Sequence, residues 1–264
     1  MSSHFASRRG AGQRAAQSLL QRDRWITGTG LLLLAGLSWI YIIGLNEGGW
    51  SWLMAMPMRH GWTGSDLLLT FLMWLVMMMA MMTPAVAPTI LLLATVERRR
   101  GQPRPRRRTA VALVGYFIVW AGACVLATLL QYGLHEAGVV YGAMSPLRAQ
   151  LAGAMLILVG IFELTPAKAA CLTRCRSPID TIARYWRPEP GGSLRVGLSH
   201  GLYCLGCCWA LMLVLFVTGV MNLLWIAILS ALILAEKLLP QGRLLSRFAG
   251  IAILIWGAIL LLRG

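Results

Sequence analysis

Seven apolar runs divide this chain, and most are close to the roughly 20 residues that a helix needs to cross a bilayer. The runs cover residues 26–44, 67–96, 110–132, 149–164, 196–220, 223–239 and 248–262. The fourth and sixth runs are short and the seventh is weakly apolar, so six spans is the alternative count. With 58% hydrophobic and only 12% charged residues, the chain is too apolar for a soluble domain of its size. We therefore predict an all-α, polytopic transmembrane helix bundle in which residues 25–264 form a single domain.

Basic residues are concentrated between these runs. The chain has 24 Lys and Arg against nine acids, a formal net charge of +15. In a soluble protein this balance would suggest nucleic acid as a partner. Here the charge falls in short blocks, a pattern typical of cytoplasmic loops, and we exclude nucleic acid. The blocks are residues 8–24, 97–108, 168–187 with Arg195, and 237–247. This pattern predicts a cytoplasmic N-terminus, an uncleaved basic tail over residues 1–24 and an outer C-terminus in a bacterial inner membrane.

The fifth apolar run contains His200, Cys204, Cys207 and Cys208. At about 100° per residue these four side chains fall within about a third of the helix circumference, so several could bind one ion. Buried cysteine can also act as a small hydrophobic residue, but three cysteines in five residues favour metal ligation. The paired motifs of a zinc finger are missing, and neighbours on one helical turn rarely form disulfides. Thiolate ligands within a membrane span favour monovalent copper.

The second apolar run carries six methionines between residues 73 and 82. Met77 and Met81 follow one another at helical spacing, with Met78 and Met82 beside them, so one face presents thioethers. Methionine also fills irregular cores, and packing is the alternative interpretation. Pro84 lies directly after the stripe and predicts a kink. A broken helix beside a row of soft ligands favours a copper(I) relay site at Met77, Met78, Met81 and Met82.

Several further groups are candidate auxiliary ligands on the cytoplasmic side. Glu163 and Glu236 end the fourth and sixth runs. Glu236 could instead form an interfacial pair with a snorkelling Lys237. Cys171 and Cys175 lie in a basic segment, where free thiols could receive or hand over copper in a reducing cytosol, or be inert.

Two further patterns concern the outer side and the helix contacts. Met54, Met56 and Met58 alternate with other residues in an outer segment, as in extracytoplasmic copper-handling motifs. Their segment could equally be an interfacial loop anchored by tryptophans. Glycines along the fifth run, beginning with Gly197 and Gly201, would allow close approach of another helix. We expect that neighbour to be the methionine-rich helix.

Four segments in order carry a family resemblance. They are residues 77–84, 164–178, 201–209 and 235–237. These segments resemble a bacterial family described as predicted metal-binding integral membrane proteins, which includes copper-chaperone-like proteins linked to maturation of copper enzymes. The similarity covers roughly residues 66–262. It implies a membrane metallochaperone, whereas the tail and the outer methionines lie outside the matched motifs.

Three classes of function compete for this pattern. The preferred one is a non-enzymatic copper(I) metallochaperone that supplies a membrane or periplasmic copper-dependent enzyme. The alternative is a transporter of copper or another soft metal. A chaperone needs no energy coupling, and the sequence contains no phosphate-binding loop or other nucleotide motif. A haem oxidoreductase is disfavoured because only His200 lies within a predicted span, so paired imidazole ligation is absent.

Overall fold

The computed structural model describes residues 25–44, 62–138, 147–189 and 191–263, and these ranges are helical without any β-strand. The predicted all-α fold class is confirmed for this part of the chain. Residues 1–24 and the outer methionines Met54, Met56 and Met58 lie outside the described residues. After an N-terminal helix, Trp25–Gly44, come α2 (Gly64–Arg99), α3 (Pro105–Glu136), α4 (Ala149–Leu164), α5 (Pro166–Cys175), α6 (Pro178–Tyr185), α7 (Gly192–Thr218), α8 (Leu223–Leu238) and α9 (Gly242–Arg263).

Five of these helices are long and apolar enough to cross a membrane: Trp25–Gly44, α2, α3, α7 and α9. Helices α4 and α5 pass the same test only as a pair bent by 64°. Helix α8 has 16 residues, which at about 1.5 Å per residue cover about 24 Å and fall short of a ~30 Å hydrocarbon core. Length and composition therefore support five or six of the seven predicted spans.

Proline and hydroxyl residues determine where several helices begin. At the start of α2, the Thr63 backbone N–H donates to the Asp66 carboxylate over 2.8 Å, and Asp66 N–H donates back to the Thr63 hydroxyl. Between α4 and α5, Thr165 caps the new helix and Pro166 occupies its first turn. Proline is favoured there because its missing N–H has no intrahelical partner. This break turns α5 away from the direction of α4.

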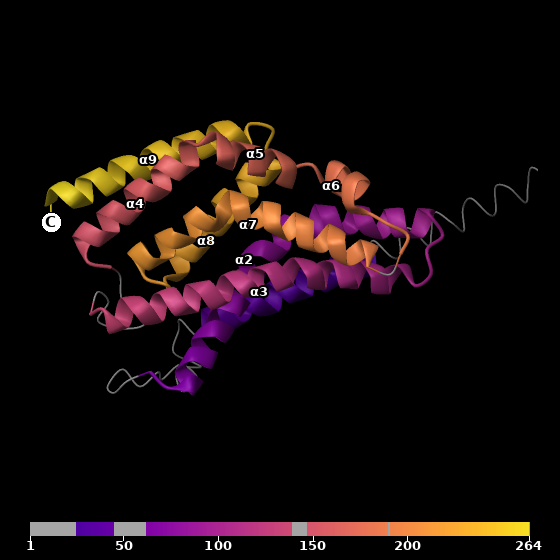
Figure 1. Cartoon of the computed structure of the whole chain (residues 1–264), viewed down its shortest axis with the longest axis horizontal. Coiled ribbons are helices and arrows are strands. Elements are labelled where there is room, and N and C mark those ends of the chain that lie inside the picture. Colours follow the sequence, from indigo (N-terminus) through magenta and orange to yellow (C-terminus); the bar gives the residue numbers. More distant parts are fainter. Residues whose placement is uncertain (1–24, 45–61, 139–146, 190, 264) are drawn as a thin grey trace, which may run out of the picture.

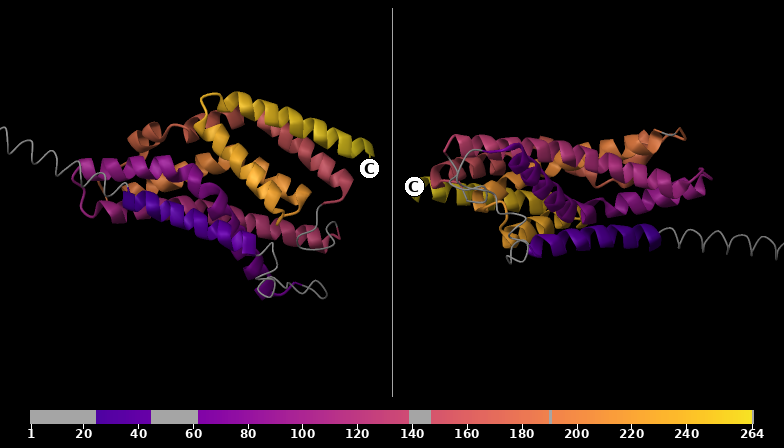
Figure 2. Two further views of the ribbon diagram at one scale, coloured as in Figure 1. Left: turned by 180° about the vertical axis from the view of Figure 1, so that it is seen from behind. Right: turned by 90° about the horizontal axis from the view of Figure 1, so that it is seen from below.

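The bundle is elongated, and the helices α4 and α9 pair along one side of it (Figure 1). The N-terminal helix lies along the outside, drawn in indigo in Figure 2. Helix α2 changes direction along its length, in keeping with its two internal prolines, Pro84 and Pro88 (Figure 1). Helices α3 and α9 each expose a broad apolar surface, as expected of helices that face lipid.

Small residues allow α7 to lie directly against α3. A Cβ atom added at Gly197 would come within 1.9 Å of the Ala112 carbonyl oxygen, and one at Gly115 would come within 2.9 Å of the Leu194 carbonyl oxygen. Side chains at these positions would force the two backbones apart. The prediction that the glycine face of α7 meets the methionine-rich helix is therefore wrong, because α3 occupies that face. Helix α2 packs on α3 instead and reaches α7 through side chains, such as the stacked rings of Trp74 and Phe216.

Three of the predicted basic blocks meet at neighbouring helix ends. Arg108 donates to the carbonyl oxygens of residues 187–189 at 2.8–3.2 Å and to the Glu97 carboxylate at 2.6 Å. Arg176 donates to the carbonyl oxygen of Leu239. These bonds join the blocks over residues 97–108, 168–187 and 237–247, which agrees with their predicted location on one side of the bundle.

Candidate metal centre

Helix α7 places three thiols at the centre of the bundle. Cys204, Cys207 and Cys208 are each at most 1% exposed. They lie at positions i, i+3 and i+4, which share one helical face. The Cys207 and Cys208 thiols both donate to the Cys204 carbonyl oxygen, at 3.1 and 2.9 Å. This bonding satisfies the thiols and holds their sulfurs close to the helix backbone.

Helix α5 brings two more thiols to the same place. Cys175 is buried, and its thiol lies within hydrogen-bonding range of the Cys204 and Cys207 thiols. The Cys171 sulfur packs over Gly206, at 3.1 Å from where a Cβ atom would stand. The bend after α4 is what lays α5 across α7. Residues that the sequence placed in a cytoplasmic segment therefore adjoin the cysteines of the apolar helix, and we call these five residues the thiol cluster.

Cys204 has two polar neighbours from other helices. The Lys237 ammonium donates to the Cys204 sulfur over 2.8 Å, and the Tyr116 hydroxyl lies 2.9 Å from the same atom. Lys237 comes from the end of α8 and is buried. A charged donor at this distance favours the thiolate form, which is the form that binds metals. Lys237 does not pair with Glu236 at an interface but points into the bundle.

The two candidate carboxylate ligands are joined by a lysine. Lys168 donates to Glu163 and, over 3.0 Å, to Glu236. Ser246 donates to Glu163 over 3.0 Å. All four side chains are buried. One Lys168 ammonium is thus shared by two carboxylates, and this ion-paired group lies beside the thiol cluster as its charged surroundings.

His200 connects α7 to α2. Its Nε2 atom lies 3.3 Å from the Thr89 hydroxyl oxygen, and the imidazole ring faces Tyr116 with centroids 5.8 Å apart. The Nδ1 atom is buried and has no hydrogen-bond partner among the described residues. This nitrogen is one turn before Cys204 and remains able to bind a ligand.

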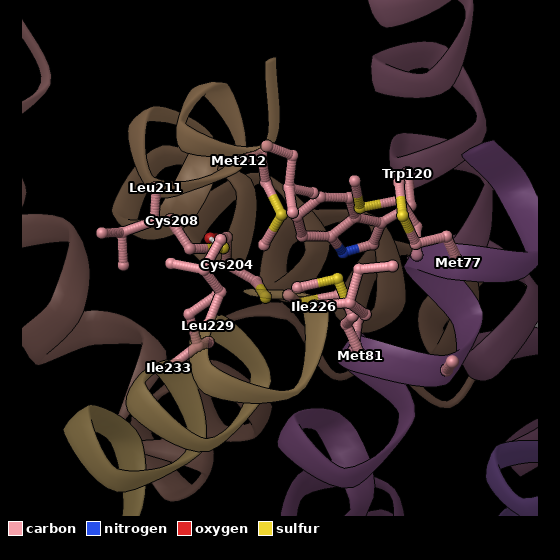
Figure 3. Packing of buried hydrophobic residues seen from close by; sticks show 14 of the residues in the cluster. Met77, Met81, Trp120, Cys204, Cys208, Leu211, Met212, Ile226, Leu229 and Ile233 are labelled. Carbon is pink, nitrogen blue, oxygen red and sulfur yellow. Dashed lines mark hydrogen bonds between the residues drawn. The ribbon is translucent and has the colours of Figure 1, made fainter. Parts of the chain in front are cut away.

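The methionines of α2 line the same core from the other side. Met77, Met78, Met81 and Met82 are all buried, whereas Met79 is only partly so. Met77 and Met81 project toward the region that contains Trp120 and Cys204 (Figure 3). Met212, which the sequence did not single out, projects into this region from α7. The thioether face and the thiol cluster therefore belong to one continuous core.

No metal site is already assembled within the described residues: no three His, Cys, Asp or Glu side chains have an arrangement that could hold an ion. In this arrangement the Cys207 and Cys208 thiols are turned toward the Cys204 carbonyl, and the Cys204 sulfur is bonded to Lys237. The donor set itself fits copper(I), because soft thiols gather beside an unpartnered imidazole nitrogen. Binding would require the thiols to rotate away from the backbone.

Two features of the bundle interior were not recognised in the sequence. Tyr116 gave no signal, since an aromatic residue in an apolar span is ordinary. Glu97 was taken only as part of a basic block, yet it is fully buried and accepts bonds from Arg108, Trp186 and Ser193 at 2.6–3.0 Å. A lone acid at the end of a long apolar run was the signal that could have found it.

The described residues thus form an all-helical protein whose apolar helices enclose thiols, thioethers and paired charges. A family described as copper chaperone, PpoB2, matches residues 71–260, well over half of the chain. The chain therefore belongs to this copper chaperone family, and the family predicted from the four sequence motifs is confirmed. The matched region runs from within α2 to near the end of α9 and contains the whole thiol cluster. No curated protein and no solved structure matches the chain.

Proposed function

We propose that this protein is an integral membrane chaperone for copper(I) in a bacterial inner membrane, and that it supplies a membrane or periplasmic copper enzyme. Its family supports a chaperone role for copper and, in general, a copper enzyme as partner. The observation that carries the proposal is the burial of Cys204, Cys207 and Cys208 on one face of the apolar helix α7, with the Lys237 ammonium against the Cys204 sulfur.

The donors support copper(I) as the ion. Thiolate and thioether sulfur prefer copper(I) to harder divalent ions. The carboxylates that could favour a harder ion, Glu163 and Glu236, are held by Lys168. We assign Cys204, Cys207 and Cys208 as principal ligands, His200 as an auxiliary one, and Met77, Met78, Met81 and Met82 as relay positions. Cys175 is the auxiliary thiol best supported by its contacts.

Lys237 has a defined part in the proposed exchange of copper. In the metal-free state its ammonium holds the Cys204 sulfur. Arriving copper takes its place on that sulfur while a second thiol of the cluster loses its proton to solvent, so the displaced ammonium keeps a thiolate partner. After copper leaves for a partner, Lys237 returns to the Cys204 thiolate and the second thiol regains a proton. A buried thiolate is thus never left without a positive neighbour, which would be costly in an apolar interior. This arrangement supports reversible loading and delivery.

Transport remains the second candidate, because thioethers continue along α2 beyond the thiol cluster. Reconstituted vesicles distinguish the two functions. A chaperone should pass copper to a purified acceptor without net flux into the vesicle, whereas a transporter should accumulate copper inside.

Replacing Cys207 and Cys208 together by serine tests the proposal. Serine preserves the size of each side chain approximately but removes the soft ligand, so the protein should fold and lose the copper bound at the thiol cluster. Met79→Leu is the matched control, because this methionine is only partly buried and points away from Met77 and Met81. Copper content after anaerobic purification and maturation of the partner enzyme at limiting copper are the measurements. Normal maturation by the double serine variant would refute the proposal.

A further inference from the structure

A cavity of about 440 Å³ lies between α2, α3 and α7, on the side of the thiol cluster that leads to the end of α7, and it opens at the outer face of the bundle beside the exposed Leu126 and Leu202. Three sulfur-containing side chains line it, one from each helix: Met78, Cys124 and Met212. Its remaining lining side chains are aliphatic or aromatic, including Trp74 and Trp120. The cavity therefore offers soft donors from three directions and no carboxylate or hydroxyl group that would suit a harder ion.

The nitrogen of Trp120 provides an independent indication of a ligand. Trp120 is 1% exposed, and its indole N–H has no hydrogen-bond partner among the described residues. The neighbouring Trp74, by contrast, donates its N–H to Gln131 over 2.7 Å. Trp120 and Cys124 stand at positions i and i+4 of α3 and share a face. A metal-bound thiolate at Cys124 would give the Trp120 N–H an acceptor that the neutral thiol does not.

The position of the cavity fits a path from the thiol cluster. Met212 follows Cys204 by eight residues on α7, about 12 Å along the helix axis. Cys124 follows Tyr116, the neighbour of Cys204, by the same interval on α3. The figure shows Met212 on α7 and Met77 on α2 on either side of Trp120 (Figure 3). The cavity is therefore the next group of soft donors toward the helix ends opposite the basic blocks.

We propose that Met78, Cys124 and Met212 form a second, transient copper(I) site through which the ion passes after leaving the thiol cluster. On binding, the Cys124 S–H bond breaks, its proton goes to solvent, and a copper–sulfur bond forms while both thioethers add their lone pairs. Trp120 is a positioning residue that donates its N–H to the resulting thiolate. This inference rests on the proposed function, since it assumes copper as the cargo.

The test uses the full chain in lipid nanodiscs, loaded anaerobically with copper(I) against a competing chelator. Wild type should bind two copper ions per chain. Met78→Leu with Met212→Leu keeps similar volumes and should remove one of them. A control with Met73→Leu and Met221→Leu, buried methionines outside the cavity lining, should still bind two.

The double serine variant of Cys207 and Cys208 separates this inference from the proposed function. In that background one copper should remain, with an X-ray absorption spectrum of three sulfur neighbours, and Cys124→Ser should remove it. Trp120→Phe should weaken that remaining copper by about 10-fold, as loss of an outer-shell donor does.

Three outcomes in the variants would overturn the inference. The first is an unchanged copper stoichiometry in the Met78 and Met212 variant. The second is an absorption spectrum with oxygen or nitrogen neighbours in the double serine background, and the third is a lipid retained in the cavity with no copper in that background. If the double serine change leaves the stoichiometry at two, the proposed function fails instead, and the cavity variants still report on the second site. If a variant does not fold, the copper stoichiometry of wild type decides the matter, because one copper ion per chain would overturn the inference.

Discussion

Replacing Lys168 by methionine should destabilise the protein more than any single change at its surface. Lys168 is 1% exposed and its ammonium bonds both Glu163 and Glu236. Methionine keeps the length of the side chain but leaves two carboxylates without their only cation in this group. Breaking a buried ion pair by removing one partner costs about 3–5 kcal/mol. We therefore expect a loss of at least about 3 kcal/mol, or about 150-fold in the folding equilibrium at 25 °C.

The free energy of unfolding in mixed detergent micelles is the measurement for this prediction. Arg247→Met, at an exposed basic residue of the neighbouring α9, should change it by less than about 0.5 kcal/mol. Adding Glu163→Gln and Glu236→Gln to Lys168→Met should restore most of the loss, because the buried negative charges are then gone. If the free energy of unfolding of Lys168→Met equals that of wild type, Glu163 and Glu236 are not charged groups that depend on Lys168, and the reasoning is refuted.

Three other outcomes can be checked directly. Gly197→Ala should loosen the contact between α3 and α7 and lower the melting temperature, because the added Cβ would lie 1.9 Å from a backbone oxygen. Gly122→Ala should leave the melting temperature unchanged, because nothing lies within 4 Å of its added Cβ. Met81→Cys should crosslink to Cys204 with a short thiol reagent once the other cysteines of α7 are serine; failure in folded protein would place the two faces apart. Reduced protein dialysed against zinc together with silver(I) or copper(I) should keep the monovalent ion and lose zinc. Equal retention of zinc would contradict the soft-metal assignment.

Side chains of both charges surround the thiol cluster. Lys237 adjoins a sulfur, whereas Lys168 adjoins two carboxylates. Positive and negative groups therefore alternate within the apolar interior, where each would be costly if isolated. In the proposed function, copper(I) enters such a site as a second thiol loses its proton, so that the copper ion and Lys237 each keep a thiolate neighbour.

Much of the fold and the site could be predicted from the sequence because the signals are local. Apolar runs of sufficient length must be helical in lipid, where every backbone group needs an internal partner. The spacing of Cys204, Cys207 and Cys208 places them on one face of α7 whatever surrounds that helix. Proline at the start of α5 likewise predicts a break after α4. The family resemblance rests on these same local motifs.

The partners of each helix were decided only by the tertiary structure. Hydrophobic periodicity reports which residues are buried but not which helix buries them, so α3 was not recognised as the neighbour of Gly197. The same limit hid the contact between Cys175 and Cys204, which are far apart in sequence and meet only because α5 bends across α7. Lys237 could have extended to an interface or turned inward, and the cost of leaving a buried thiolate unpaired favours the inward position. The sequence thus determines which soft donor side chains share a helix face, whereas their assembly around one sulfur depends on long-range packing between helices.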